Sequence, residues 1–410
     1  MKTKLSLAVA AALLAGASSA NAGIMIPAGD WTLDIGGVVN AYYTSTRFTG
    51  NQTAGYGGLF LGGKAPGAAG TVSNITTGLL PNYLSVSGKT RQNDLDVGFT
   101  ISINPGASTT SAGQQGGTVG GVSNQENRQA FLTFGDKSWG SIKLGKDLGI
   151  YASDAILNDM TLLGVGGGAG HLAGNTTTLG RIGTGFMYAD WKSQVAYSSP
   201  NWNGFSFTGG VTQAWNAINV NLPGTTTKER GGASPAFEGK ASYEWAGDFG
   251  GKVWVSGITQ KVRGVSDTAK SGDIGATVNV AGFGLTGYYY TGEGIGQTVQ
   301  LNGGFDALGN ARDSDGYYVQ GTYTIPTVGT KLGLSWGRSN LDHNNSAADI
   351  NNPDLEDSMW TIGAYHPVTK HLNLVAEYSD AKTKTKGATD PLDNHSGKGK
   401  TISLGGILFF

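Results

Sequence analysis

The sequence of 410 residues has no cysteine, few charged side chains and no long apolar run after its N-terminus. Without cysteine, no disulfide can hold the fold together. A formal net charge of −1 gives no strongly basic surface, which excludes nucleic acid as a partner. Beyond residue 22, no uninterrupted apolar stretch approaches the roughly 18 residues of a transmembrane helix, so the sequence predicts no such helix after cleavage.

The composition also disfavours helices of any kind. The 69 glycines interrupt most stretches that could form a helix. Tyr, Val, Thr, Phe and Trp, which favour strands, recur instead in short segments. The chain is therefore predicted to be nearly all β.

The first 22 residues have the pattern of a secretory signal peptide. Two lysines precede an apolar run over residues 5–17, and Ala20-Asn21-Ala22 forms a small-x-small cleavage site. The run is too short for a membrane helix. We expect residues 1–22 to be removed and residues 23–410 to form one domain, whose formal charge becomes −1 − 2 = −3.

The mature sequence contains sixteen segments with strand character. In Asp94–Ile103, for example, Leu95 and Val97 share one face with three further apolar residues, whereas Asp94 and Asp96 share the other, which is the period of a strand. The expected strands are 31–47, 83–90, 94–103, 128–135, 139–146, 192–199, 204–214, 236–246, 250–262, 273–281, 283–291, 315–325, 330–340, 358–367, 371–383 and 399–410.

The connections between these segments alternate strictly between short and long. Seven are short, and eight are long and rich in Gly, Asn, Ser and Thr. This alternation is typical of an antiparallel meander whose termini both lie on the side of the short turns. A soluble β-sandwich shows no such sidedness, whereas outer-membrane barrels have short periplasmic turns and long external loops.

The C-terminal segment Thr401–Phe410 carries no charged residue and alternates with period two. Its even-numbered residues are expected to face lipid, with Phe410 in the periplasmic aromatic girdle. Pairing of this segment with the first strand would close the ring, because only helices and closed barrels satisfy the backbone within a bilayer. The sequence predicts a 16-stranded antiparallel transmembrane β-barrel with a water-filled lumen.

Three groups of residues resemble a known family, the Gram-negative general diffusion porins. The first and second groups lie around the longest connection, and the third is the terminal Phe410. The motifs are Arg128-Gln129-Ala130-Phe131, Gly140 to Lys146, Tyr151-Ala152-Ser153-Asp154-Ala155 and Asp159-Met160, then Leu179-Gly180-Arg181-Ile182-Gly183 and Tyr197 to Phe205.

The resemblance implies a trimer in the outer membrane of a Gram-negative bacterium and a third external loop that folds into the barrel. In this chain the matching loop is 147–191. By the same resemblance, Arg128 and Arg181 match wall arginines of the pore constriction, and Asp159 and Asp154 match carboxylates of the loop. Opposed charges in a narrow wet pore would bias which ions pass.

This sequence departs from the family pattern at two places. The loop tip, Leu163 to Gly167, lacks the glutamate of enteric members, and Tyr83 stands where a third wall arginine is expected. Simpler roles also remain open, because Arg128 could form a surface ion pair and Asp159 could cap a short helix.

Five further charged residues are candidates for the pore lining. Lys143 and Lys146 lie on the strand that leads into the long loop. The alternation in residues 236–246 places Glu238, Lys240 and Glu244 on the polar face, which would point into the lumen.

The expected function is passive diffusion of ions and small hydrophilic solutes, without catalysis, cofactor or metal. The five histidines show no metal-binding spacing. The alternatives are a substrate-specific channel, an adhesin, or a barrel hydrolase with a catalytic histidine in an external loop, His171 or His343.

Besides lipid, the expected partners are two further copies of the chain, which the resemblance implies are contacted through the loop at 104–127. The sequence leaves the preference between anions and cations open.

Overall fold

The computed structural model describes residues 23–50, 70–108, 118–119, 122–123, 125–167, 177–216, 234–265, 267–350, 352–387 and 396–410. The predicted signal peptide and His171 lie outside these residues. So do parts of the external loops, including much of the predicted subunit contact at 104–127.

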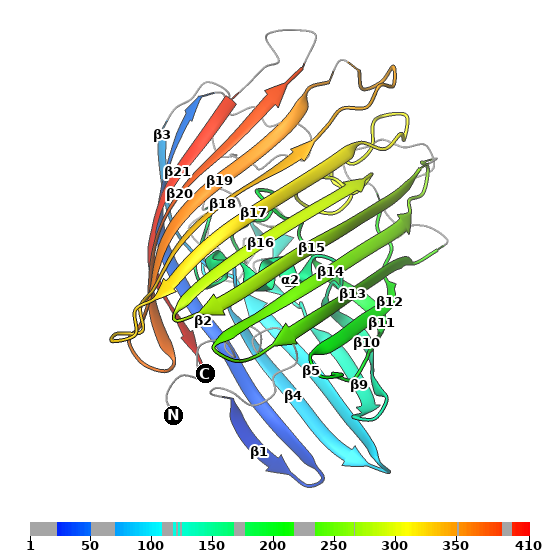
Figure 1. Ribbon diagram of the computed structural model, residues 1–410, viewed down its shortest axis with the longest axis vertical. Helices are drawn as coiled ribbons and strands as arrows, with labels where there is room; N and C mark the ends of the chain where they lie inside the picture. The colour runs from blue at the N-terminus through cyan, green and yellow to red at the C-terminus, as the bar shows by residue number, and fades with distance from the viewer. Residues whose placement is uncertain are drawn as a thin grey trace.

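One antiparallel sheet closes on itself to form the wall of a barrel (Figure 1). The wall has sixteen strand positions, which confirms the predicted barrel, and β3 and β4 together occupy one of them. The strands are β2 (Trp31–Gly50), β3 (Gly70–Thr76), β4 (Tyr83–Gln92), β5 (Leu95–Pro105), β9 (Ala130–Asp136), β10 (Gly140–Leu148), β11 (Trp191–Ser198), β12 (Phe205–Thr212), β13 (Ala236–Trp245), β14 (Phe249–Lys261), β15 (Thr268–Val280), β16 (Phe283–Glu293), β17 (Asp313–Thr324), β18 (Lys331–Leu341), β19 (Asp354–Pro367), β20 (Leu372–Lys386) and β21 (Ser396–Phe409).

Two strands of five or more residues, β1 (Ile24–Ala28) and β3, were not expected from the sequence, nor were the three two-residue strands described below. β1 forms a hairpin with the start of β2, and β3 lies within the predicted loop 48–82. The gap between β3 and β4 is bridged by Asn40, whose amide oxygen accepts from the Gly78 backbone at 2.8 Å and whose amide nitrogen donates to the Leu80 carbonyl at 2.9 Å. A side chain from another strand thus continues the wall where the local sequence cannot.

Three minor strands and two short helices complete the described structure. The strands β6 (Thr118–Val119), β7 (Val122–Ser123) and β8 (Gln125–Glu126) have two residues each. The helices are α2 (Ser153–Asn158) and the 3₁₀ helix η1 (Met160–Leu163). None of the helices in the described part of the chain is long and apolar enough to cross a membrane.

The first and last wall strands pair and close the ring. The register between β2 and β21 runs from Val38 opposite Phe409 to Gly50 opposite Gly397. Phe410 extends it, because its backbone nitrogen donates to the Gly37 carbonyl at 3.1 Å and its carbonyl accepts from Gly37 at 2.8 Å. The predicted role of the C-terminal segment in closure is confirmed.

The two faces of the wall differ as the alternation predicted. On β2, Val39 on the outer face is 55% exposed, whereas its neighbour Asn40 on the inner face is 2% exposed. Across the wall the outer face carries large apolar side chains such as Ile274 and Leu285, and buried polar groups such as Gln194 point inward. This arrangement is inverted relative to a soluble globule and suits a hydrocarbon surround.

The short turns gather at one end of the barrel and the long connections at the other. Between β4 and β5, Asn93 and Asp94 adopt φ values of 50° and 61°. Such left-handed residues form the two-residue turns that match the twist of paired strands. The predicted sidedness of the connections is therefore confirmed.

We predict that Gly37→Ala will destabilise the closed barrel. A Cβ at this position would lie 2.3 Å from the Tyr83 carbonyl oxygen and 2.7 Å from the Phe410 ring, so the closing strands must shift. Overpacking of this kind costs about 1–3 kcal/mol. The temperature at which the folded form is lost on heating in detergent should fall.

Gly239→Ala is the matched control, because its Cβ would meet nothing closer than the Thr208 carbonyl at 3.7 Å. If both variants unfold at the temperature of the unsubstituted protein, the close packing at the barrel seam does not contribute to stability.

Candidate functional site

The described residues of the connection from β10 to β11, 149–167 and 177–190, fold into the barrel and cross its interior. We call this segment the inner loop. It carries α2 and η1, and Figure 1 shows α2 within the ring of strands. Its hydrogen bonds run along the inner faces of β13, β14, β17, β19 and β20 and reach β2.

The beginning of the inner loop is bound to Glu238 of β13. One carboxylate oxygen of Glu238 accepts from the backbone nitrogens of Ile150 and Tyr151 at 2.8 and 2.9 Å. The other accepts from Lys192 Nζ at 2.6 Å. A buried carboxylate that accepts several hydrogen bonds keeps its charge compensated, so Glu238 holds the loop at its origin rather than facing open water.

The loop tip is bound to Glu377 of β20 in the same way. Its Oε2 accepts from the backbone nitrogens of Val165 and Gly166 at 2.7 and 2.8 Å, and its Oε1 accepts from the Tyr365 hydroxyl at 2.6 Å. Tyr42 of β2, which is two strands along the wall from β20, donates to the Leu163 carbonyl at 2.8 Å. The sequence analysis missed Glu377, because β20 presents it as one of several inward polar residues and no local signal identifies its distant partners.

Asp154, in the first turn of α2, faces two lysines of the wall. Its carboxylate lies 3.2 Å from Lys240 Nζ and 2.6 Å from Lys252 Nζ. Burial raises the pKa of Asp154, but the two ammonium groups outweigh burial and hold the pKa below its usual value. Asp154 is therefore ionised at neutral pH. A loop carboxylate opposite positive wall residues was expected from the family resemblance, but the positive residues here are Lys240 and Lys252 and not Arg128 and Arg181.

Asp159 caps η1, which was the simpler role left open by the sequence. Its carboxylate accepts from the Thr161 backbone nitrogen at 3.0 Å. It also lies 4.0 Å from Arg181 Nε, and both side chains are fully buried. Burial raises the pKa of Asp159, and the Arg181 charge opposes that rise.

Arg181 lies on the inner loop and not on the wall, contrary to the role implied by the family resemblance. Its guanidinium donates to the carbonyls of Met359 and Thr184 at 3.0 and 3.3 Å. Burial lowers the pKa of Arg181, and Asp159 opposes this effect. Because its side chain has no exposed surface, Arg181 fixes the loop rather than lining a water path.

Arg128 lies at the base of the inner loop and is also almost fully buried. Its Nε donates to Glu126 at 2.9 Å, and its guanidinium stands 5.7 Å from the centre of the Trp191 ring. The structure thus contains an ion pair of Arg128, as the alternative role required, but the pair is buried and not at the surface.

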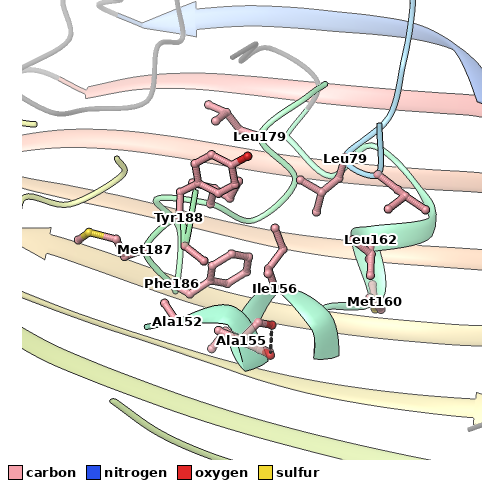
Figure 2. Packing of buried hydrophobic residues seen from close by; sticks show 14 of the residues in the cluster. Leu79, Ala152, Ala155, Ile156, Met160, Leu162, Leu179, Phe186, Met187 and Tyr188 are labelled. Atoms are coloured by element: carbon pink, nitrogen blue, oxygen red, sulfur yellow. Dashed lines mark hydrogen bonds between the residues drawn. The ribbon is translucent and has the colours of Figure 1, made fainter. Parts of the chain in front are cut away.

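Apolar side chains fill the space within and around the inner loop (Figure 2). Ile156 of α2, Leu162 of η1 and Phe186 belong to one buried cluster with Leu79 of the interrupted wall strand. The Phe186 ring lies 5.8 Å from the Tyr318 ring of β17. This packing leaves the loop few alternative positions.

A second external connection, residues 294–312, reaches the inner loop. Gln300 accepts from Lys192 Nζ at 2.8 Å and donates to the Tyr188 carbonyl at 3.1 Å. Thr298 accepts from the Tyr188 backbone nitrogen at 3.0 Å. The sequence analysis treated this connection as an ordinary external loop, because nothing in its composition indicates a partner.

The remaining candidate lining residues divide between the two faces. Lys143 and Lys240 point inward and are partly exposed, with Lys143 paired to Asp147. Glu244 points inward beside Lys252, 3.0 Å away. Lys146 was wrongly predicted to line the pore, because it is paired with Ser193 and shares the outer face with Leu144. Lys143 and Lys146 are three residues apart on one strand, so the alternation of side chains points them to opposite faces.

In the pairs of Lys143 with Asp147 and of Lys240 and Lys252 with Asp154, the ammonium groups are more exposed than the carboxylates, whereas Glu244 is 55% exposed beside Lys252 at 22%. Side-chain exposure is 30% for Lys143 against 5% for Asp147, and 27% and 22% for Lys240 and Lys252 against 4% for Asp154. An ion in the lumen would therefore meet these ammonium groups before Asp147 or Asp154, with Glu244 exposed alongside them. Among the described residues, no group of three side chains is arranged to hold a metal ion.

We predict that Glu377→Ala will release the tip of the inner loop while leaving the barrel folded. The substitution leaves the nitrogens of Val165 and Gly166 and the Tyr365 hydroxyl without their acceptor, at about 1–3 kcal/mol for each group left unsatisfied. Single-channel recordings should show a larger and noisier conductance.

Glu293→Ala serves as the control, because Glu293 pairs with Lys270 and is half exposed. A conductance for Glu377→Ala equal to that of the control and of the unsubstituted protein would show that this anchor does not position the loop.

Comparison with known proteins agrees with this geometry. A family model described as Gram-negative porin matches residues 7–386. The anion-selective porin from Comamonas acidovorans superposes with a TM-score of 0.59 at 14% identity, covering 93% of this chain and 100% of that chain. The outer membrane channel DcaP of Acinetobacter baumannii gives 0.63 at 16% identity, covering 95% and 100%.

A third solved structure, OmpF of Salmonella typhi in complex with daunomycin, gives a TM-score of 0.51 at 15% identity, covering 93% and 100%. At these identities the likeness concerns the fold. A search of curated protein sequences gives no match.

A closed barrel with an apolar outside and a polar inside, matched over most of its length by a porin model, is a multi-pass outer-membrane channel for passive diffusion of solutes. The chain belongs to the Gram-negative porin family.

Proposed function

We propose that ions and small hydrophilic solutes pass through this porin beside the inner loop, along a path whose narrow level is set by Asp154, Lys240 and Lys252. The observation that carries the proposal is the exposure of the two ammonium groups in front of a buried carboxylate. The loop is fixed at its beginning by Glu238 and at its tip by Glu377, so it narrows the lumen at a defined height.

We further propose that this level favours anions over cations. Lys240, Lys252 and Asp154 carry a formal sum of +2 − 1 = +1. Glu244, 3.0 Å from Lys252, brings the formal sum of the four groups to zero, so the proposed direction rests on the two lysines that face the buried Asp154. The solved structure of similar fold from Comamonas acidovorans is itself described as an anion-selective porin, which agrees with this direction.

The side-chain contacts give no specific support to a barrel hydrolase or to a sugar-specific channel. For a hydrolase, the external His343 would have to orient a nucleophile, but its Nδ1 lies 2.6 Å from Asp354, which also accepts from the His343 backbone nitrogen. For a sugar-specific channel, inward aromatics would have to face open water. Tyr288, Tyr290 and Tyr318 point inward but are buried beneath the inner loop. We therefore propose a non-catalytic channel without a dedicated solute site.

We propose that the porin is a homotrimer in the outer membrane, as its family resemblance implies. The connection at 104–127 is the expected contact, and β8 within it pairs with the end of β5. This pairing extends the wall at the level where a neighbouring subunit would be met.

We predict that the double substitution Lys240→Gln and Lys252→Gln will lower the ratio of anion to cation permeability by about two- to fourfold at low salt. The local formal charge changes from +1 to −1, because Asp154 then has no opposing lysine. The reversal potential of a purified channel in a planar bilayer with a salt gradient measures this ratio directly.

Lys146→Gln is the matched control, because it removes a lysine from the outer face. An unchanged reversal potential in the double variant, or an equal shift in the control, would refute the proposed path. An absence of conductance from folded, unsubstituted protein would refute the channel itself.

A further inference from the structure

The external connection 294–312 leaves the wall at β16 and returns at β17, yet it contacts a residue on β11. We call this segment the second loop. Four other strands separate β11 from β16, so the second loop crosses the mouth of the barrel above those strands. External loops are usually exposed to solvent, but Gln297, Gln300 and Leu301 are at most 1% exposed. The second loop therefore turns inward, as the inner loop does.

Apolar side chains fix the second loop over the ends of β14 and β15. Leu301 and Phe305 form a buried cluster with Val262, which follows β14, and with Ala269 of β15. Trp215, three residues beyond the end of β12, packs against this cluster. All of these positions lie at the end of the strands that carries the long connections. The second loop thus covers the sector of the mouth above β12 to β15.

Gln300 connects the second loop to the wall and to the inner loop. Its side-chain oxygen accepts from Lys192 Nζ at 2.8 Å, and its side-chain nitrogen donates to the carbonyls of Tyr188 and Ala189 at 3.1 and 3.2 Å. Lys192 Nζ also lies 2.6 Å from Glu238, the residue that holds the beginning of the inner loop. One buried amide therefore joins the second loop to both limbs of the inner loop, directly at the returning limb and through Lys192 and Glu238 at the beginning.

The backbones of the two loops also approach closely beside Gln300. The Tyr188 backbone nitrogen donates to the Thr298 carbonyl at 3.0 Å. Gly183 of the inner loop has a φ of 76°, and a Cβ at this position would lie 2.5 Å from the Thr298 hydroxyl oxygen. Only glycine fits there, because it tolerates this φ and leaves room for the second loop.

The connection from β18 to β19 holds the second loop from its other side. Asp349 of that connection accepts from two guanidinium nitrogens of Arg312 at 2.7 and 2.8 Å, and both side chains are almost fully buried. In the opposite sense, Asp306 of the second loop accepts from Asn344 at 3.2 Å and from the Ser346 hydroxyl. A bidentate pair of arginine and carboxylate has a specific geometry. The second loop is therefore held in one position from both sides.

We propose that the second loop closes the sector of the mouth above β12 to β15, and that Gln300 is the positioning residue that keeps this sector closed. Since this placement rests on the proposed function, it concerns the same path and determines where solutes enter it. They enter on the other side of the lumen, along β9 and β10, where Thr133 and Lys143 point inward and are partly exposed. The size of the solutes that pass then depends on the second loop as well as on the inner loop.

The test compares two single-cysteine reporters in the folded, detergent-solubilised porin, which has no cysteine of its own. Ala269→Cys lies in the buried cluster under the second loop, whereas Thr133→Cys faces the lumen beside Lys143. With a charged methanethiosulfonate reagent, Ala269→Cys should react about 100-fold more slowly than Thr133→Cys.

Addition of Gln300→Ala should raise the reaction rate at Ala269→Cys by about 10- to 100-fold, because the loss of a buried hydrogen-bonding group favours opening of the second loop. The rate at Thr133→Cys should stay the same, and single-channel conductance should increase. Loss of the folded band on heating checks that the variant folds, and the comparison of the two reporters in the presence of Gln300 tests the closed sector without it.

Gln213→Ala is the matched control, because the Gln213 amide donates to the adjacent Ala214 carbonyl at 3.3 Å. Equal reaction of the two reporters in the presence of Gln300 would show that the sector is open and overturn the proposal. So would an Ala269→Cys rate that Gln300→Ala leaves unchanged or that Gln213→Ala raises equally. A faster rate with unchanged conductance would also overturn it, because the second loop would then not limit the path. Failure of the proposed function itself would differ, since the unsubstituted protein would then give no conductance whatever the labelling rates.

Discussion

The whole structure depends on one constraint, that a backbone surrounded by hydrocarbon must satisfy every polar group internally. A sheet can do so only by closing, and here the closure is made by β2 and β21 and completed by the pairing of Phe410 with Gly37. The constraint explains why Asn40 bridges the gap between β3 and β4, since an interruption in the wall would leave unpaired groups. It also explains the inversion of polarity, because apolar side chains must then cover the outer face.

The interior follows a different logic. Inside the barrel, backbone nitrogens of the inner loop donate hydrogen bonds to carboxylates of the wall. Glu238 accepts from the beginning of the loop, and Glu377 accepts from its tip. Because the bonds are made to the backbone, they hold the course of the loop whatever its side chains are. Asp154 and the two lysines opposite it are thereby placed at a fixed height, where their charges act on passing ions. Stability of the ring and selectivity of the pore therefore rest on separate sets of residues.

The sequence predicted the sixteen wall positions and their faces because both follow from period-two alternation, which is local. The sequence did not predict β1 or β3, whose short segments carry no such alternation. Lys146 was placed on the wrong face because it was grouped with Lys143, although the two residues are three positions apart. The site was predicted less well. Resemblance placed Asp154 on the loop, where it lies beside Lys240 and Lys252 and not beside the expected arginines. It also placed Arg181 on the wall, whereas Arg181 is buried within the loop. Glu377 and Lys252 depend on contacts between residues far apart in the chain, which no local pattern records.

The central claim is that water fills the inside of this barrel and lipid covers its outside. Because the natural chain has no cysteine, single cysteines can be introduced without any background thiol. The neighbouring residues Ala241 and Ser242 of β13 point outward and inward, respectively. In reconstituted membranes, Ser242→Cys should react with a charged, membrane-impermeant thiol reagent, and Ala241→Cys should not. Equal labelling of the two positions, or labelling of Ala241→Cys alone, would contradict the account.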